Sequence, residues 1–373
     1  MPKNLRTWVE IDASAIAKNI ARLKSFLAPK TKFLAVVKSN AYGHGMVAYA
    51  KEAKKSGVDF FGVDSFEEAM ELRAAGIKES ILVLGYVFPA NFAECAKRNI
   101  SVTISSLESL KAATLTRKAT LKVHIKVDTG LHRQGFQPND VEKVFAEIHK
   151  AGNKIIVEGL YTHFAVMESP KYESYSRMQI RELQKWRNVF SMVGFRPIVH
   201  SSASSGIVYG KDFHFDMVRA GISLYGLWPS NEIREVAPKT KLSPLLSWKT
   251  IVSEVKKVRA GERVGYDLTE KLNRDSVLAV VPVGYWHGIP RALSGKGEFL
   301  IRGKRTKIVG RVSMDMLVVD ATDIAGVAQG DEVVIIGAQG KEKMSAEEVA
   351  EKAGTINYEI VTRINPLIQR IYK

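Results

Sequence analysis

Residues 35–45 read AVVKSNAYGHG, and this stretch shows the pattern on which much of the chain is built. An apolar run from Phe33 to Val37 ends abruptly in Lys38, and the chain then passes through a turn rich in asparagine and glycine. A short apolar run bounded by turn residues is typical of a buried β-strand. The sequence therefore predicts a strand that places a lysine at its carboxyl end.

Similar runs follow as far as about residue 230, and helical patterns separate them. One predicted helix has Ser65 and Glu68 in the positions of a capping box and ends at Gly76. Eight alternations of strand and helix predict an α/β fold of the parallel (β/α)₈ barrel type, a TIM-like barrel. The eight runs are FLAVV (33–37), FFGVD (60–64), ILVLG (81–85), ISVTI (100–104), LKVHIKV (121–127), IVEGLYT (156–162), PIVHS (197–201) and FDMVR (215–219).

A barrel of this kind brings the carboxyl ends of its strands to one mouth, where active sites lie. Polar residues close several of the predicted strands. A lysine at this mouth is partly desolvated, which lowers its pKa and favours Schiff-base chemistry, although the default interpretation of a lone lysine is a surface residue. The residues expected to converge are Lys38, Asp64, Asp128, His163, Ser201, Ser202 and Arg219.

The pattern changes after about residue 236, where strand-like segments alternate with glycine-containing turns. Only SAEEVAEKAG (345–354) reads as a clear helix, with Ser345 as its cap. We therefore predict a barrel domain over residues 10–235 and a mostly-β domain over residues 236–373.

Composition narrows the classes of function. The net charge of +16 is compatible with nucleic-acid binding, but the lysines form no dense tract and no aromatic platform accompanies them. The single cysteine, Cys95, excludes an intrachain disulfide and favours a reducing compartment. No signal peptide or membrane-spanning run is visible. We expect a soluble cytoplasmic protein that binds neither nucleic acid nor membranes, with no metal site.

The segment AVVKSNAYGHG closely resembles the motif around the pyridoxal-phosphate lysine of alanine racemases. Further blocks resemble that family in the same order over essentially the whole chain. They are KVDTGLHRQG (126–135), EGLYTHFA (158–165), HSSASSG (200–206), MVRAGISLYG (217–226), VGYD (264–267), VPVGYWHGIPR (281–291), GRVSMD (310–315), GDEVVIIG (330–337) and GTINYE (354–359).

The resemblance implies pyridoxal 5′-phosphate as cofactor, bound covalently by Lys38. It also implies that Arg219 faces the pyridine nitrogen of the cofactor. Because an arginine does not give up its proton, that nitrogen stays unprotonated, which makes the ring a weaker electron sink and suppresses transamination. The residues implied as phosphate ligands are Tyr42, Ser204, Gly221, Ile222 and Tyr358.

Racemisation requires a second base on the opposite face of the reacting carbon, and Tyr266 matches that residue. Its phenol has a reference pKa of about 10, so that pKa must be lowered for catalysis near neutral pH. His163 matches the residue that hydrogen-bonds this tyrosine, with Arg219 behind it. In the family the tyrosine comes from the partner subunit, so the resemblance implies an obligate homodimer. It also implies that the N-terminal strand, about residues 1–10, packs with the C-terminal domain.

Four further residues match groups around the substrate. Arg133 matches the arginine that orients the cofactor and the substrate carboxylate, and Lys126 matches a lysine that is carbamylated in many relatives. Met314 and Asp315 match partner-subunit residues near the substrate carboxylate. Residues expected along the access channel are Glu168, Arg291, Ile356 and Tyr358.

The resemblance implies interconversion of L- and D-alanine, which supplies D-alanine for bacterial peptidoglycan. A racemase of serine or of a broader range of amino acids is the alternative. A related decarboxylase and a pyridoxal-phosphate carrier are disfavoured, since the expected decarboxylase motifs are missing and a carrier lacks the β domain. The chain departs from the common family pattern at Ala203, Ser313, Asp267, His132 and residues 286–288.

Overall fold

The computed structural model describes residues 4–115 and 120–373 and divides into two compact units. The barrel unit consists of Ala15–Ala41 and Met46–Pro244. The β unit consists of Tyr42–Gly45 and Leu245–Lys373 together with the N-terminal segment through Ser14. Residues 1–3 of the N-terminal strand that we expected lie outside the described residues.

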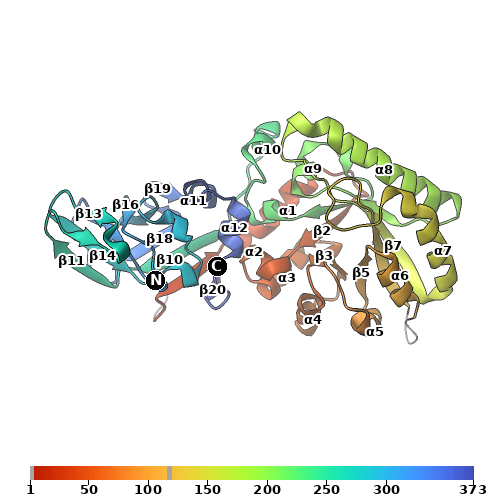
Figure 1. Ribbon diagram of the computed structural model, residues 1–373, viewed down its shortest axis with the longest axis horizontal. Coiled ribbons are helices and arrows are strands. Elements are labelled where there is room, and N and C mark those ends of the chain that lie inside the picture. Colours follow the sequence, from red (N-terminus) through yellow and green to blue (C-terminus); the bar gives the residue numbers. More distant parts are fainter. Residues whose placement is uncertain (1–3, 116–119) are drawn as a thin grey trace. The chain divides into compact units, whose positions relative to one another are not determined.

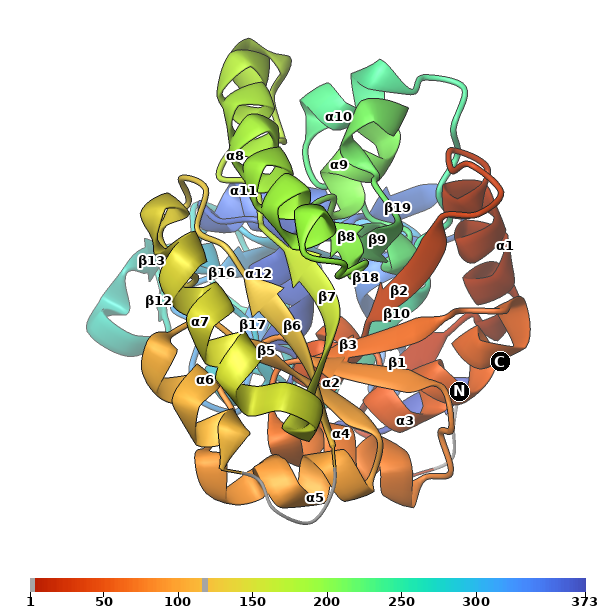
Figure 2. The same ribbon diagram turned by 90° about the vertical axis from the view of Figure 1, so that its right-hand side faces the viewer.

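The barrel unit confirms the predicted (β/α)₈ barrel. Parallel strands β2 to β9 follow one another in chain order, and β9 pairs with β2 to close the barrel, with Arg219 opposite Leu34 (Figure 2). Each predicted run overlaps one of these strands, with ends shifted by at most two residues. They are β2 (Lys32–Val36), β3 (Phe60–Val63), β4 (Ser80–Val83), β5 (Ile100–Ile104), β6 (Leu121–Lys126), β7 (Ile155–Tyr161), β8 (Ile198–His200) and β9 (Met217–Ala220).

The burial of the barrel strands explains their composition. Every residue of β3 and of β5 is buried, because helices cover the outer face of the strands while side chains fill the interior. The helices around the barrel are amphipathic; in α7, for example, Val144, Ile148 and Ala151 are buried at spacings of four and three residues. The helices of this unit are α1 (Ala13–Lys24), α3 (Met46–Ala53), α4 (Phe66–Ala74), α5 (Phe92–Lys97), α6 (Leu107–Thr114), α7 (Val141–Ala151), α8 (Glu173–Met192), α9 (Ser204–Tyr209) and α10 (Asn231–Val236).

The β unit is built on a mixed sheet in the order β11-β14-β17-β16-β15-β18-β10-β1-β20 (Figure 1). In β10 the residues Leu246, Trp248 and Thr250 are buried and alternate with less buried neighbours, so one face of this strand packs on the core. The strands are β1 (Thr7–Ile11), β10 (Leu246–Ile251), β11 (Glu254–Val258), β12 (Arg263–Val264), β13 (Glu270–Lys271), β14 (Ser276–Val281), β15 (Glu298–Ile301), β16 (Lys304–Val309), β17 (Leu317–Asp320), β18 (Glu332–Gln339), β19 (Glu342–Met344) and β20 (Arg370–Tyr372).

Strand β1 belongs to this sheet, although it precedes the barrel in the sequence. It pairs antiparallel with β10 and parallel with β20. The expected helix is present as α11 (Ala346–Ala353), with the Ser345 hydroxyl accepting from the Glu348 amide. A second helix, α12 (Asn357–Thr362), was not predicted, because the segment GTINYE is too short for helical periodicity to be visible. In the described part of the chain, every helix is too short or too polar to span a bilayer.

Candidate active site

Lys38 directly follows β2 and begins an unusual turn. The short helical segment α2 (Lys38–Tyr42) is left-handed, since φ is near +55° at Ser39 and Asn40 and remains positive at Ala41 and Tyr42. Residues with a Cβ avoid this region, at a cost of roughly 1–2 kcal/mol for each residue. Four such residues in succession therefore persist only where tertiary contacts hold them.

Those contacts come mainly from the carboxylate of Glu68. Its two oxygens accept the Ser39 amide at 2.6 Å and the Asp64 amide at 2.7 Å. The Ser65 hydroxyl caps α4 by accepting the Glu68 amide, as predicted, but the Glu68 side chain does not complete the capping box. It instead links the Ser39 amide, directly after the candidate lysine, to the Asp64 amide at the end of β3.

Within the β unit, Gly43 continues the turn, and only glycine fits there. Its φ is +83°, and a Cβ would lie 2.0 Å from the carbonyl oxygen of Val361. The rings of Tyr42 and Tyr358 lie 6.2 Å apart, so two of the expected phosphate ligands are neighbours. Arg370 donates to the Gly43 carbonyl at 2.9 Å and ties the same turn to β20.

The Lys38 ammonium is paired with the Asp64 carboxylate at 2.8 Å. The Lys38 side chain is 36 % exposed and is therefore only partly desolvated. The same end of the barrel contains a second lysine, Lys126, which is buried and donates to the Gln134 side chain at 3.0 Å. Burial, followed by the neighbouring charge of Arg133, lowers the pKa of Lys126 to about 8.

Arg219 is buried on β9, and no described carboxylate pairs with it. Its guanidinium donates to the carbonyls of Thr162 and Ser201 at 2.9 and 2.7 Å, and to the imidazoles of His163 and His200 at 3.1 and 2.7 Å. None of the described hydrogen bonds uses its Nε–H. The Asp216 carboxylate, three residues before Arg219, accepts the Val199 amide at 2.9 Å. Burial lowers the pKa of Arg219 to about 10, so the group remains charged at neutral pH.

His163 accepts from Arg219 through Nδ1, so its own proton is on Nε2. Burial and the charge of Arg219 hold the pKa of His163 well below its usual range. His163 is therefore a neutral imidazole whose Nε2–H is a donor. The structure thus places His163 beside Arg219, the arrangement implied by the resemblance.

Ser204 begins α9 after β8, and Gly221 follows β9. The Ser204 hydroxyl accepts hydrogen bonds from the amides of Gly221 at 2.9 Å and Ser223 at 3.4 Å. Ser204 therefore lies next to the segment that contains Gly221 and Ile222. The Ser223 hydroxyl is buried there without a hydrogen-bond partner in the described chain. This location, after the last two barrel strands, is where many barrels bind phosphate.

Arg133 is exposed in the loop after β6, and no described hydrogen bond or ion pair holds its side chain. The buried carboxylate of Asp128 accepts the amides of Gly130 and His132 at 3.0 Å and shapes this loop. His132 has φ of +57°, which explains why relatives often have glycine there. Asp267, another departure from glycine, has φ of +58°.

Tyr266 lies in the β unit, in the short 3₁₀ helix η8 (Tyr266–Leu268), and is 69 % exposed. Asp267 pairs with Arg311 at 2.7 Å and thereby fixes the turn that carries the tyrosine. Met314 and Asp315 are exposed in the loop before β17. The carbonyl of Met314 accepts the Trp286 amide at 3.0 Å.

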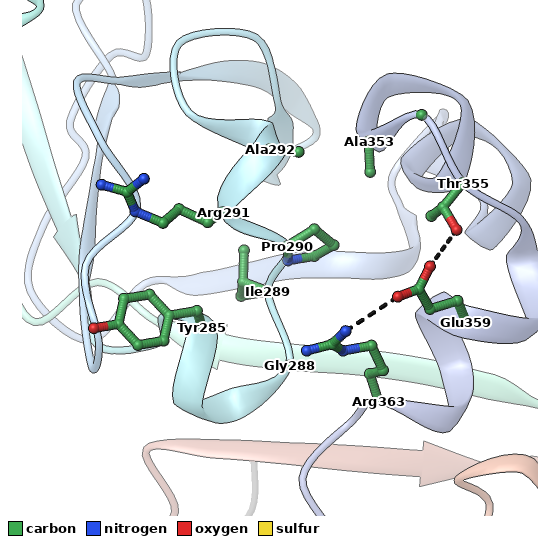
Figure 3. Close-up of a pocket in the computed structure, with 11 residues that line it drawn as sticks. Tyr285, Gly288, Ile289, Pro290, Arg291, Ala292, Ala353, Thr355, Glu359 and Arg363 are labelled. Carbon is green, nitrogen blue, oxygen red and sulfur yellow. Dashed lines mark hydrogen bonds and ion pairs between the residues drawn. The ribbon is translucent and has the colours of Figure 1, made fainter.

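A pocket of about 550 Å³ lies within the β unit. Tyr285 and Arg291 lie on one side of it, while Thr355, Glu359 and Arg363 lie on the other (Figure 3). Arg291 was expected along an access channel, whereas Ile356 and Tyr358 are not among the residues that line this pocket. Glu168 is exposed in the barrel unit.

Sequence reasoning missed several polar residues near these groups. Glu68 was recognised only as a helix-capping residue, and Tyr285 only as part of a motif. His200 and His124 were not singled out, although the alternation of Lys122, His124 and Lys126 in an apolar strand is a visible signal of polar residues on one strand face.

A (β/α)₈ barrel with a lysine after its first strand and a buried arginine on its last strand, followed by a β unit, defines a class of two-domain barrel proteins. Two family models match the chain: alanine racemase, N-terminal domain, over residues 11–229, and alanine racemase, C-terminal domain, over residues 245–372. The chain belongs to the alanine racemase family, as its motifs indicated.

Relatives and solved structures agree with this assignment. The alanine racemase of Halothermothrix orenii is 41% identical over 371 residues, covering 98% of this chain and 97% of the relative. That of Symbiobacterium thermophilum is 40% identical over 372 residues, with coverage of 98% and 97%. The crystal structure of Bacillus anthracis alanine racemase with bound L-Ala-P has a TM-score of 0.94 and 36% identity, covering 100% of this chain and 96% of that chain.

The Glu68 carboxylate makes two hydrogen bonds that hold the turn after Lys38. We expect Glu68→Gln to weaken both and to lower the free energy of unfolding by about 1.5–3 kcal/mol, the range for hydrogen bonds to a charged group. Hydrogen exchange at the Ser39 amide should accelerate at the same time. Glu67→Gln removes an exposed carboxylate from the same helical turn and is the matched control. Equal behaviour of the two variants in urea unfolding and hydrogen exchange would contradict this role.

Proposed function

We propose that the protein interconverts L- and D-alanine with pyridoxal 5′-phosphate as its cofactor. The observation that carries the proposal is the buried, charged Arg219, held by carbonyls and imidazoles beside a mouth that contains Lys38 and Lys126. The relatives named above are all alanine racemases, which favours alanine over serine as the substrate. We further propose that the product D-alanine serves peptidoglycan synthesis in the cytoplasm.

The residues at the barrel mouth fit the cofactor. A phosphate dianion and an aromatic ring with a nitrogen acceptor require positive charge, hydroxyls and amide donors. The mouth offers the charges of Lys38 and Arg219, and the buried Ser223 hydroxyl beside Ser204 has no hydrogen-bond partner among the described residues. In this proposal the phosphate ligands are Tyr42, Ser204, Gly221, Ile222 and Tyr358, and the domains are the barrel at 10–235 and the β domain at 236–373.

When bound, pyridoxal phosphate makes the α-proton of an attached amino acid acidic enough to remove. Lys38 would hold the cofactor through Nζ and would act as the base on one face of the substrate. Arg219 would hold the ring nitrogen, with its Nε–H, which no described hydrogen bond uses, as the donor. Because a guanidinium is only a donor, a nitrogen held in this way would stay an unprotonated acceptor.

Tyr266 serves the opposite face of the substrate and comes from a second copy of the chain. Its exposure in the β unit supports this role, since a phenol in a shared site is covered only after association. It is accompanied by other exposed apolar side chains, as is typical of interfaces. They are Leu268, Tyr285, Trp286, Met314, Met316, Ile356 and Leu367.

The fixed tautomer of His163 provides a hydrogen-bond donor for the second base, Tyr266. Arg219 occupies Nδ1, so the Nε2–H of His163 is the group that meets the tyrosine oxygen. A hydrogen-bond donor of this kind stabilises a phenolate relative to a phenol. Arg133 and the partner's Met314 and Asp315 bind the substrate carboxylate, and Arg291 lies on the access path.

Lys38→Ala should abolish racemisation and the visible absorption of the bound cofactor together. We expect a loss of activity of roughly 10²–10⁴-fold, the range for removing a group that transfers a proton. Lys51→Ala, which removes an exposed lysine of α3, is the control and should leave both unchanged. Retention of activity by the Lys38 variant would exclude Lys38 as the cofactor-binding base.

Tyr266→Phe should slow proton removal from L-alanine more than from D-alanine, because each base serves one face. The rates are measured as exchange of the α-hydrogen for deuterium with each enantiomer. Tyr86→Phe removes another exposed tyrosine hydroxyl and should change neither rate. Equal slowing of both directions would exclude a mechanism with two bases.

Lys126 is proposed to carry a carbamate that holds Arg133 in place. The neutral amine attacks carbon dioxide and releases one proton, so formation requires the deprotonated lysine. With a pKa of about 8, we expect uptake of ¹³C-labelled bicarbonate to rise as the pH passes upward through that value. The ¹³C NMR signal should vanish in Lys126→Met and persist in Lys122→Met. An unmodified Lys126 in a mass spectrum of protein kept in bicarbonate would refute the carbamate.

A further inference from the structure

The barrel interior contains a column of polar side chains below Arg219. Barrels of this type are usually filled by layers of branched apolar residues. Here β6 instead carries Lys122, His124 and Lys126 at alternate positions, and both His124 and the neighbouring His200 are fully buried. Burial of two imidazoles is unfavourable unless each nitrogen has a partner.

Each nitrogen of the two imidazoles has a partner. Arg219 Nη1 lies 2.7 Å from His200 Nδ1, and His200 Nε2 lies 2.9 Å from His124 Nδ1. His124 Nε2 lies 3.1 Å from a carboxylate oxygen of Glu158. The four residues form one continuous chain of hydrogen bonds from β9 through β8 and β6 to β7, which we call the Arg219 column.

The positions of the protons in this column follow from the chemistry of its first member. A guanidinium has no acceptor, so His200 Nδ1 must be unprotonated and its proton must be on Nε2. His200 then donates to His124 Nδ1, which leaves the proton of His124 on Nε2 as well. That proton is donated to Glu158, which must be ionised. Protonating either imidazole a second time would place two N–H groups against each other.

The far end of the column is built to hold a carboxylate. Glu158 also accepts from the Ser101 hydroxyl, and its other oxygen lies 3.3 Å from Lys122 Nζ. Burial alone would raise the pKa of Glu158, but hydrogen bonds from His124 and Ser101 and the charge of Lys122 lower it to about 2. Burial and the charge of Arg219 hold the pKa of His200 well below its usual range.

The backbone makes room for the column. A Cβ on Gly159 of β7 would lie 2.0 Å from His124 Nδ1, so this position accommodates the ring only as glycine. The pairing of β6 with β7 shifts its register between Val123 and His124, directly at this point. His200 also stacks on the Tyr161 ring at 4.6 Å between centroids. These features restrict both imidazoles to one orientation.

We propose that His200, His124 and Glu158 are positioning residues that set the direction and preserve the charge of Arg219, an inference that rests on the proposed racemase function. The column offers Arg219 a lone pair of a neutral imidazole in place of a carboxylate. The compensating negative charge of Glu158 lies two imidazoles away. The guanidinium therefore stays fully positive, while its Nε–H, which no described hydrogen bond uses, remains available as a donor.

The first test determines directly which imidazole nitrogens carry a proton, and it requires no catalytic turnover. The holoenzyme is labelled with ¹⁵N-histidine, and long-range ¹H–¹⁵N correlation spectra identify the protonated nitrogen of each of the eight histidines. The substitutions His124→Phe and His200→Phe assign the signals. We expect both imidazoles to be neutral with the proton on Nε2 near pH 7. A proton on Nδ1 of either residue, or an imidazolium, would overturn the proposal even if racemisation is observed.

The second test changes the far end of the column. Glu158→Gln places an amide where three donors converge, so we expect the His200 nitrogen signals to shift. We also expect kcat to fall roughly tenfold to a hundredfold, as for loss of a hydrogen bond to a charged group, with a smaller change in KM. Glu10→Gln is the matched control, because the side chains of Glu10 and Glu158 are 15 % and 14 % exposed and both are ion-paired.

The outcomes separate this proposal from the proposed function. If the Glu158→Gln and Glu10→Gln variants have the same His200 nitrogen signals and the same kcat, the positioning role is overturned. Should Glu158→Gln fail to fold, Ser101→Ala removes one donor from Glu158 and should shift the same signals by a smaller amount; unshifted signals would count against the proposal. A wild-type protein that shows the expected tautomers but no racemisation would refute the racemase function and leave the proton arrangement established.

Discussion

The central physical constraint in this protein is a buried guanidinium that needs acceptors on every side. Arg219 has five N–H donors and no lone pair to offer, so its neighbours must accept. Carbonyls from two strand ends and two imidazole nitrogens accept from its two Nη groups, while no described hydrogen bond uses its Nε–H. This requirement sets the tautomer of His163 at the mouth and that of His200 in the interior. One donor-only group thus orders the protons of residues on several strands.

A second constraint is the left-handed turn after Lys38. The turn is unfavourable for residues with a Cβ, and it persists because Glu68 binds two backbone amides while Gly43 fits against the Val361 carbonyl. Relaxation of this turn would break these contacts together. The lysine at its start is consequently fixed at its backbone, and its ammonium pairs with the Asp64 carboxylate.

The two units contribute different kinds of chemistry. The barrel unit holds the cations and the neutral imidazoles in a buried, low-dielectric setting, where each charge strongly affects its neighbours. The β unit instead exposes a tyrosine and a group of apolar side chains. Tyr266 is 69 % exposed there, so the proposed use of its phenol as a base depends on association with another copy.

The sequence by itself determined the order of strands and helices, the residue types at the strand ends and the family, because apolar periodicity, capping signals and motifs are local in the chain. It identified Lys38, His163, Arg219, Ser204 and Tyr266 as candidates. It missed the hydrogen bonds of the Glu68 carboxylate to two backbone amides and the helix α12. It also missed the hydrogen-bonded chain of His200, His124 and Glu158. Only the tertiary structure decided these, because hydrogen-bond partners follow from strand register and from the room left by a single glycine. Those relations join residues far apart in the chain, and no local pattern encodes them.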